Sequence, residues 1–367
     1  MIVAEPASDR RGIYYWKCDR AAAFHGTAAG LPLVDLEEPL LGALTAAFPD
    51  RSMALRAAGG QGNHRTYLAE IGDEAAFVRV EDGPERDDYL EVESHLLAKV
   101  ARCGVPAPRV LAVDATRIRV PFAWQALERI PHPDLNEHYK RGRLRLNDVA
   151  EKIGTAVARW QGIEPRGFGP FRTEVVRDAQ SLEGFHARYE DYFMLRLERH
   201  LGFLVDRGFL AMEEAREIES LIVEHRSLLA SERGCLVHKD LALWNILGTE
   251  TEIAAFIDWD DAISGDPMDD LSLLGCFYDG PVLARAVIGY VAVRPLPEEH
   301  ARRFWLHLLR NMIVKAVIRV GAGYFERTDG FYLIGSGSSG EDLRAFTRMR
   351  LAAALHGLRT NQPIETL

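Results

Sequence analysis

Hydrophobic and polar residues follow two different periods along the chain, and the change between them falls near residue 130. Between residues 52 and 130, short apolar runs such as RTYLAEI and AAFVRV are separated by turn-forming segments such as GGQGN and GDE. This spacing is typical of β-strands in a small, mostly antiparallel sheet. One segment, from Tyr89 to Ala101, has apolar residues at helical spacing instead. The pattern predicts three strands, one helix and then two more strands.

Beyond about residue 147 the pattern becomes mainly helical. Two β-like runs, CLVHKD and IAAFID, interrupt it and predict a hairpin-like insert. Helical periodicity predicts a short helix at 40–48 and further helices at 148–161, 182–204, 212–230, 268–276, 282–291, 298–320 and 341–357. The sequence therefore predicts an α+β protein with an N-terminal extension (1–50), a sheet-containing domain (51–130) and a helical domain (131–367).

Composition narrows the class of protein. The chain has 367 residues, 47% hydrophobic and 27% charged, which is typical of a soluble globular protein of about two domains. Its net charge of −10 disfavours nucleic acid as a partner. The four cysteines are far apart in the sequence, and no segment resembles a signal peptide or a membrane span. We therefore expect a cytoplasmic protein with no membrane association.

The densest polar cluster is HKDLALWN, which contains His238, Asp240 and Asn245, and it is followed by FIDWDD with Asp258. Phosphoryl transfer from a nucleotide needs a carboxylate that orients and deprotonates the acceptor hydroxyl, and oxygen ligands for magnesium. An Asp and an Asn five residues apart, with a second Asp after the next strand, supply these groups. Oxygen ligands without Cys or His favour Mg²⁺ over zinc or iron.

Together with GDPMDDL at residues 265–271, these segments resemble the aminoglycoside phosphotransferase and choline kinase-like family of small-molecule kinases. The resemblance extends from about Leu40 to Leu274. It implies a bilobal, protein-kinase-like fold, in which a small antiparallel-sheet lobe binds the nucleotide and a larger helical lobe carries the catalytic loop.

The resemblance also implies a role for each matching residue of the second lobe. Asp240 would be the catalytic base, and Asn245 and Asp258 would hold Mg²⁺. His238 would be a structural residue of the catalytic loop, and Asp270 would brace that loop from the following helix.

In the first lobe, the family pattern places the nucleotide phosphates near the GGQGN turn, which contains Gly60 and Asn63. Arg79 stands where several family members have Lys, and Arg can contact two phosphate oxygens at once. The expected acidic partner of Arg79 is Glu93, with Glu91 as the neighbouring candidate. The alternative for these charged residues is a solvent-exposed surface without a specific role.

The segment WQALERIP resembles the hinge between the two lobes of this family. Backbone groups from Glu128 to Ile130 would meet the purine there. Backbone recognition does not distinguish ATP from GTP, so both remain candidate phosphoryl donors.

Residues that would contact the acceptor are suggested by charge. The segment from Pro281 onward has 12 Lys and Arg against 7 Asp and Glu, which favours a neutral or anionic acceptor. Asp260, close to the expected metal site, favours an ammonium or hydroxyl group instead. One helix of this segment has a polar stripe that either faces solvent or faces the acceptor, formed by His307, Asn311, Lys315 and Arg319.

The sequence thus predicts an ATP- or GTP-dependent phosphotransferase that acts on a hydroxyl group of a sugar, an amino alcohol or an antibiotic. Two alternatives stay open: a nucleotide-binding pseudokinase that regulates a partner, and an enzyme that transfers the nucleotidyl group. The sequence assigns no role to the aromatic stretch Tyr14, Tyr15 and Trp16.

Overall fold

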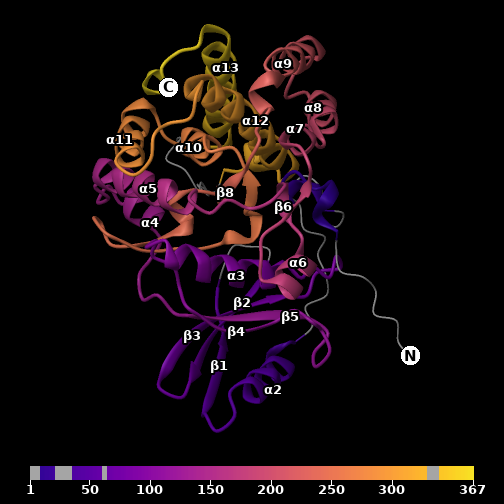
Figure 1. Cartoon of the computed structure of the whole chain (residues 1–367), viewed down its shortest axis with the longest axis vertical. Helices are drawn as coiled ribbons and strands as arrows, with labels where there is room; N and C mark the ends of the chain where they lie inside the picture. Colours follow the sequence, from indigo (N-terminus) through magenta and orange to yellow (C-terminus); the bar gives the residue numbers. More distant parts are fainter. Residues whose placement is uncertain (1–8, 21–34, 60–63, 329–338) are drawn as a thin grey trace.

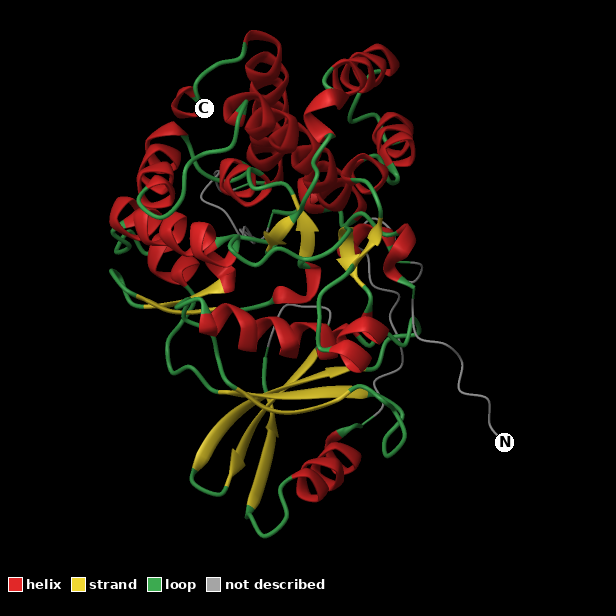
Figure 2. Ribbon diagram, viewed as in Figure 1, coloured by secondary structure: helices red, strands yellow, loops and turns green. Residues whose placement is uncertain are grey.

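The computed structural model describes residues 9–20, 35–59, 64–328 and 339–367. A twisted sheet with its two flanking helices forms the lower part of the molecule in Figure 1, and a larger, mainly helical part lies above it. Figure 2 shows the same division by secondary structure. The predicted α+β organisation, with a change from strands to helices near residue 130, is confirmed.

The lower part is built on a five-stranded sheet in which all neighbouring strands run antiparallel, in the order β1-β2-β3-β5-β4. Its central strand places the Arg79 side chain opposite Thr66 and Gln125. All five predicted strands are present, as β1 (Met53–Ala57), β2 (Arg65–Ile71), β3 (Glu74–Glu81), β4 (Val110–Asp114) and β5 (Ala123–Glu128).

One helix packs on each face of this sheet. Helix α2 (Glu37–Ala47) buries Leu40 and Leu44 against the sheet, in one apolar cluster with Val78 and Val80. Helix α3 (Tyr89–Arg102) contacts β4 and β5 and lies between the sheet and the helical part (Figure 1). The apolar side of α3 belongs to the core of the helical part, so this helix couples the two halves of the molecule.

The helical part surrounds short strands that carry the polar loops identified in the sequence. Strands β6 (Phe168–Phe171), β7 (Gly184–His186), β8 (Cys235–Val237) and β11 (Ile263–Gly265) form a second sheet, and β9 (Ile246–Gly248) pairs with β10 (Ile253–Phe256). Around them lie α4 (Leu135–Lys140), α5 (Leu146–Trp160), α6 (Thr173–Ala179), α7 (Tyr189–Phe193), α8 (Leu197–Asp206), α9 (Met212–Glu224), α10 (Asp269–Gly275), α11 (Gly280–Val291), α12 (His300–Gly321) and α13 (Gly340–Thr360).

Two expectations about this part are wrong. The run CLV pairs with β11, while IAAF pairs with β9, so the two runs do not form one hairpin. A turn of only four residues joins β9 to β10, which makes that pairing the more local one. The helix predicted at 182–204 is divided into β7, α7 and α8, because Gly184 packs on the Phe168 backbone and Arg196 adopts a left-handed φ of 58°.

The N-terminal residues 9–20 lie against the helical part rather than against the sheet. They contain η1 (Arg10–Gly12) and α1 (Trp16–Asp19). A fully buried hydrogen bond between Asp19 and His200 of α8, with 2.7 Å between Oδ1 and Nε2, attaches this segment to the core. Asp19 also accepts the backbone N–H groups of Tyr14 and Tyr15, which fixes the local turn. Just before this anchor, the side chains of Tyr15 and Lys17 point toward the polar loops.

Candidate active site

The loop after β8 is held in one conformation by a buried carboxylate. Asp270 of α10 accepts hydrogen bonds from the backbone N–H groups of His238 (3.0 Å) and Lys239 (3.1 Å). The His238 ring contacts the Ile257 carbonyl oxygen at 3.0 Å and the N–H of Asp240 at 3.3 Å. Lys239 adopts a left-handed φ of 68° at this point. These contacts fix the backbone that carries Asp240.

Asp240 itself is 2% exposed and is surrounded by donors. Asn245 Nδ2 lies 3.1 Å from its Oδ2 atom and 2.8 Å from its carbonyl oxygen. Lys17 Nζ lies 2.6 Å from Oδ2, and Lys315 Nζ lies 3.1 Å from Oδ1. Burial alone would raise the pKa of Asp240, but the two lysines lower that pKa well below its usual value. The carboxylate is therefore ionised throughout the neutral range.

Two of the groups around Asp240 come from the N-terminal segment and were missed in the sequence. Tyr15 donates its hydroxyl to Asp240 Oδ1 at 2.7 Å, and Lys17 is the ammonium group described above. The aromatic cluster Tyr14–Trp16 was the only sign of this role, because three adjacent aromatic residues in a polar stretch need a place to be buried. Neither spacing nor motif connects residue 17 to residue 240.

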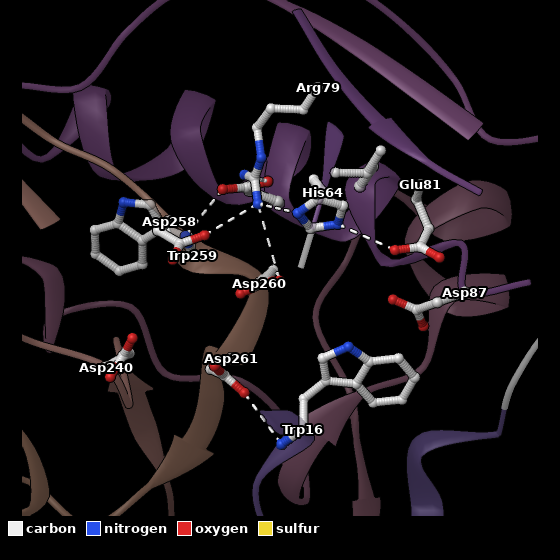
Figure 3. A network of polar contacts seen from close by, with 12 residues as sticks. Trp16, His64, Arg79, Glu81, Asp87, Asp240, Asp258, Trp259, Asp260 and Asp261 are labelled. Atoms are coloured by element: carbon white, nitrogen blue, oxygen red, sulfur yellow. Dashed lines mark hydrogen bonds and ion pairs between the residues drawn. The ribbon is translucent and has the colours of Figure 1, made fainter. Parts of the chain in front are cut away.

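A second charged cluster links the five-stranded sheet to the loop after β10 (Figure 3). Arg79 of β3 forms a buried ion pair with Glu93 of α3, which confirms the pairing that was predicted and leaves Glu91 outside it. Arg79 also donates to Asp258 Oδ1 at 3.0 Å. Glu93 accepts the backbone N–H of Trp259 at 2.9 Å, so both halves of the molecule share one network.

The oxygen atoms of Asn245 and Asp258 are suited to a divalent cation. Asn245 uses its amide nitrogen for Asp240, and its side-chain oxygen accepts no hydrogen bond from the described residues. Asp258, in a left-handed conformation with φ of 65°, accepts only from Arg79 among them and keeps 29% of its side chain exposed. One amide oxygen and one accessible carboxylate are hard ligands of the kind that Mg²⁺ prefers.

Asp260 and Asp261 follow the metal-binding candidate and point to different partners (Figure 3). Asp260 Oδ2 lies 3.9 Å from Arg79, while its carbonyl oxygen accepts from Arg10. Asp261 Oδ1 accepts the backbone N–H of Trp16 at 3.2 Å. Burial, and the charge of neighbouring Asp260, raise the pKa of Asp261 to about 7. The N-terminal segment thus contacts the backbone of Asp260 and the carboxylate of Asp261.

These groups line one cleft of about 1240 Å³ between the sheet and the helical part. Arg79, Glu93, Asp240, Asn245 and Asp258 all contribute to its wall. Glu128 and Ile130 of the predicted hinge also line this cleft. Gly59 of the predicted phosphate-binding turn lines it as well. Gly60 and Asn63 lie outside the described residues.

The predicted polar stripe of α12 is buried, so its solvent-facing alternative is wrong. His307, Asn311, Lys315 and Arg319 are each at most 8% exposed. Lys315 and Arg319 line the cleft. His307 is not among the residues that line it and lies 3.4 Å from Asp266 instead, and Asn311 donates to Asp269 at 2.8 Å. The stripe is therefore divided between the cleft and the support of α10.

Comparison with known sequences places these residues in a family. The model of the phosphotransferase enzyme family matches residues 54–305, which is more than half of the chain. The chain belongs to the phosphotransferase enzyme family. The family that the sequence motifs resemble is thereby confirmed, and with it the prediction that the protein is a phosphotransferase. No curated protein sequence matches the chain.

Solved structures of similar fold confirm the kinase-like architecture of this phosphotransferase. Aminoglycoside phosphotransferase APH(4)-Ia is 17% identical with a TM-score of 0.58, over 87% of this chain and 98% of that one. A putative fructosamine-3-kinase from Haemophilus somnus 129PT is 12% identical with a TM-score of 0.57, over 85% and 96%. APH(2″)-IIa, in a complex with streptomycin and ATP, is 16% identical with a TM-score of 0.56, over 89% and 99%.

The matched region contains the elements that carry the two charged clusters, except for the N-terminal segment and the part of α12 that follows residue 305. Tyr15, Lys17, Lys315 and Arg319 of this phosphotransferase all lie outside residues 54–305. None of the described helices is long and apolar enough to cross a membrane.

Proposed function

We propose that this protein transfers the γ-phosphoryl group of ATP or GTP to a hydroxyl group of a small molecule, with Asp240 as the catalytic base. The observation that carries the proposal is the position of Asp240, which is a buried, ionised carboxylate on the wall of the cleft. It touches Asn245 directly, and Asp258 lines the same cleft. A base and metal-ligand oxygens side by side are what phosphoryl transfer requires.

The acceptor hydroxyl would donate its hydrogen bond to Asp240, which orients it toward the γ-phosphoryl group and takes its proton as the new P–O bond forms. Lys17 and Lys315 keep this carboxylate ionised between turnovers. The base is therefore a weak one, and its role is mainly to position the hydroxyl. Tyr15 fixes the orientation of the carboxylate through its 2.7 Å hydrogen bond.

Arg79 would contact the phosphates of the nucleotide, because its guanidinium is held in the cleft by Glu93 and by Asp258. Asn245 and Asp258 would hold Mg²⁺, which when bound neutralises charge that develops on the transferred phosphoryl group. At the opposite end of the cleft, the backbone from Glu128 to Ile130 would meet the purine.

The family and the size of the cleft support a small-molecule acceptor. Space of about 1240 Å³ accommodates a nucleotide together with a small molecule. A structure of APH(4)-Ia holds ADP and hygromycin B, and one of APH(2″)-IIa holds streptomycin and ATP. These relatives support a hydroxyl-bearing acceptor such as a sugar, an amino alcohol or an antibiotic.

The test is a screen of such alcohols with Mg·ATP and Mg·GTP, in which each product is identified by its mass. An added phosphate is the expected product, whereas an added nucleotide would indicate nucleotidyl transfer. Asp240→Ala should lower kcat by about 10²–10⁴-fold and leave the KM for ATP nearly unchanged. Asp148→Ala, which removes an exposed carboxylate paired with Arg145, is the matched control. Unchanged turnover in Asp240→Ala, or nucleotide binding without any transfer, would contradict the proposal.

A further inference from the structure

Three cations gather where α12 and α13 meet the cleft. Lys315 and Arg319, one turn apart on α12, are 8% and 6% exposed and line the cleft. Arg350 of α13 is 5% exposed, and its charge acts on Arg319. Lys315 is the only one of the three that contacts a carboxylate of the described residues, because it lies 3.1 Å from Asp240. Arg319 and Arg350 form no ion pair with any of these residues.

Hydrogen bonds to the described residues use few of the donors of these two arginines. Arg319 donates to the Thr347 hydroxyl at 2.8 Å, and Arg350 donates to the Tyr278 carbonyl oxygen at 3.2 Å. Burial lowers the pKa of Arg319 to about 10, and the charge of Arg350 acts in the same direction. A buried charge without a counterion is costly, so proteins keep such a group mainly where a ligand supplies the opposite charge.

Arg310 of the same helix is a buried arginine whose guanidinium donors have partners within the protein. It is fully buried, and it donates to the carbonyl oxygens of Phe193 and Leu195 and contacts the His200 ring at 3.1 Å. Three partners occupy its guanidinium. Arg319, two and a half turns further along α12, has one neutral partner and lines the cleft instead. Burial alone therefore does not explain Arg319.

The wall around Arg319 contains no carboxylate among the described residues that line the cleft. It is formed by Ile318 of α12, Tyr324 and Leu343, with Phe277 next to Lys315 at 5.6 Å from the ring centre. The positive charges of Lys315 and Arg319 repel an ammonium group, and Arg319 is the recognition element of this otherwise uncharged wall. Four residues of helix separate Lys315, which touches the base, from Arg319, a rise of ~6 Å.

We propose that the acceptor is a small alcohol that also carries a carboxylate or phosphate group, which Arg319 binds together with Lys315 while the hydroxyl group lies at Asp240. This inference rests on the proposed function and names its substrate class. Because Arg319 lies one helical turn from Lys315, a backbone rise of ~6 Å, the anionic group would lie several bonds from the reacting hydroxyl. Arg favours either anion because its planar donors match two oxygens at once.

The test compares four probes with similar carbon skeletons: glucose, glucosamine, gluconate and glucose 6-phosphate. Each is added to the full-length protein with saturating Mg·ADP, which fills the nucleotide end of the cleft, and the melting temperature is measured at constant ionic strength. Gluconate or glucose 6-phosphate should raise the melting temperature more than glucose and glucosamine do. The gluconate and glucose 6-phosphate arms distinguish a carboxylate from a phosphate.

Variants assign the effect to the cleft. Arg319→Gln should abolish the anion-dependent rise, and Arg319→Lys should retain part of it. Arg302→Gln, on the exposed side of α12 and paired with Glu299, should behave like the wild type. A larger rise with glucosamine, no rise with either anion, or an unchanged rise in Arg319→Gln would overturn the inference. If Arg319→Gln does not fold, the comparison of the four probes on the wild type still tests whether the protein prefers an anionic ligand.

The outcome is separable from that of the phosphotransfer screen. Asp240→Ala should keep the anion-dependent rise and lose transfer. Transfer to a neutral or cationic alcohol with an unchanged KM in Arg319→Gln would refute the anionic acceptor and leave the phosphotransferase proposal intact. An Arg319-dependent rise in melting temperature without transfer to any alcohol would refute the phosphotransferase proposal and leave anion binding at Arg319 intact. For an anionic acceptor found in the screen, Arg319→Gln should raise its KM at least tenfold without changing the KM for ATP.

Discussion

Replacing Asp270 by Asn tests whether a buried, titrating carboxylate holds the catalytic loop. Asp270 is fully buried and accepts three N–H groups, from His238, Lys239 and the Trp160 indole at 2.9 Å. Burial raises its pKa from 3.8 to about 6, although these donors act in the opposite direction. The folded protein therefore binds this proton more tightly than the unfolded chain does.

The magnitude follows from linkage. Between pH 3.8 and 6 the folded state holds more protons at Asp270, so the free energy of unfolding falls as pH rises through this window. About 1.4 kcal/mol per pKa unit gives ~3 kcal/mol over the whole window, of which ~1–2 kcal/mol lies between pH 5 and pH 8. Asn at this position does not titrate, so the free energy of unfolding of Asp270→Asn lacks this decrease with rising pH.

The assay is urea unfolding of the wild type and Asp270→Asn from pH 5 to pH 8 at constant ionic strength. The stability of the variant relative to the wild type should improve by ~1–2 kcal/mol across this range. Asp270→Ala serves as the control: it also lacks the titration, but it leaves three buried donors unpaired and should be less stable at every pH, by ~1–3 kcal/mol per donor. A stability difference between wild type and Asp270→Asn that stays constant with pH would refute the reasoning.

Three further changes probe the site and the packing around it. Lys17→Met removes the ammonium 2.6 Å from Asp240, so the pKa of that carboxyl should rise, and the acid limb of the kcat/KM profile should move to higher pH. Superimposable profiles would contradict this role. Gly154→Ala should destabilise the fold by ~3 kcal/mol in urea, because its Cβ would lie 1.8 Å from the Ala286 carbonyl oxygen at the contact of α5 with α11. Gly42→Ala, where no atom lies within 4 Å of the added Cβ, should instead stabilise α2 by ~0.5–1 kcal/mol, and a loss of stability there would contradict the packing.

Local patterns predicted the fold well where an element buries one face against a neighbour that is close in sequence. The five strands were predicted from short apolar runs separated by turn-forming segments, and α3 from helical spacing, all of which are local features of the sequence. Prediction failed at Leu182–Leu204, where helical periodicity continued through a strand and a break. Gly184 and Arg196 decide that segment through backbone contacts and a left-handed φ, which no period encodes.

The sequence by itself was enough to predict the residues of the proposed reaction centre. Asp240, Asn245 and Asp258 lie within 19 residues of one another, so a loop and a short hairpin are enough to bring them together, and their types and spacing already indicate phosphoryl transfer. The pairing of Arg79 with Glu93 was also within reach, because strand and helix follow each other in the chain.

Only the tertiary structure decided what surrounds that centre. Lys17 and Lys315 approach Asp240 from residues 223 positions before it and 75 positions after it, and such contacts leave no local pattern in the sequence. The same holds for the α12 stripe, whose polar residues are consistent with a solvated surface until α10 and α13 are packed over them. Burial favours a ligand-binding role for Arg319, because a cation without a counterion is common in water but costs free energy when it is buried in a cleft.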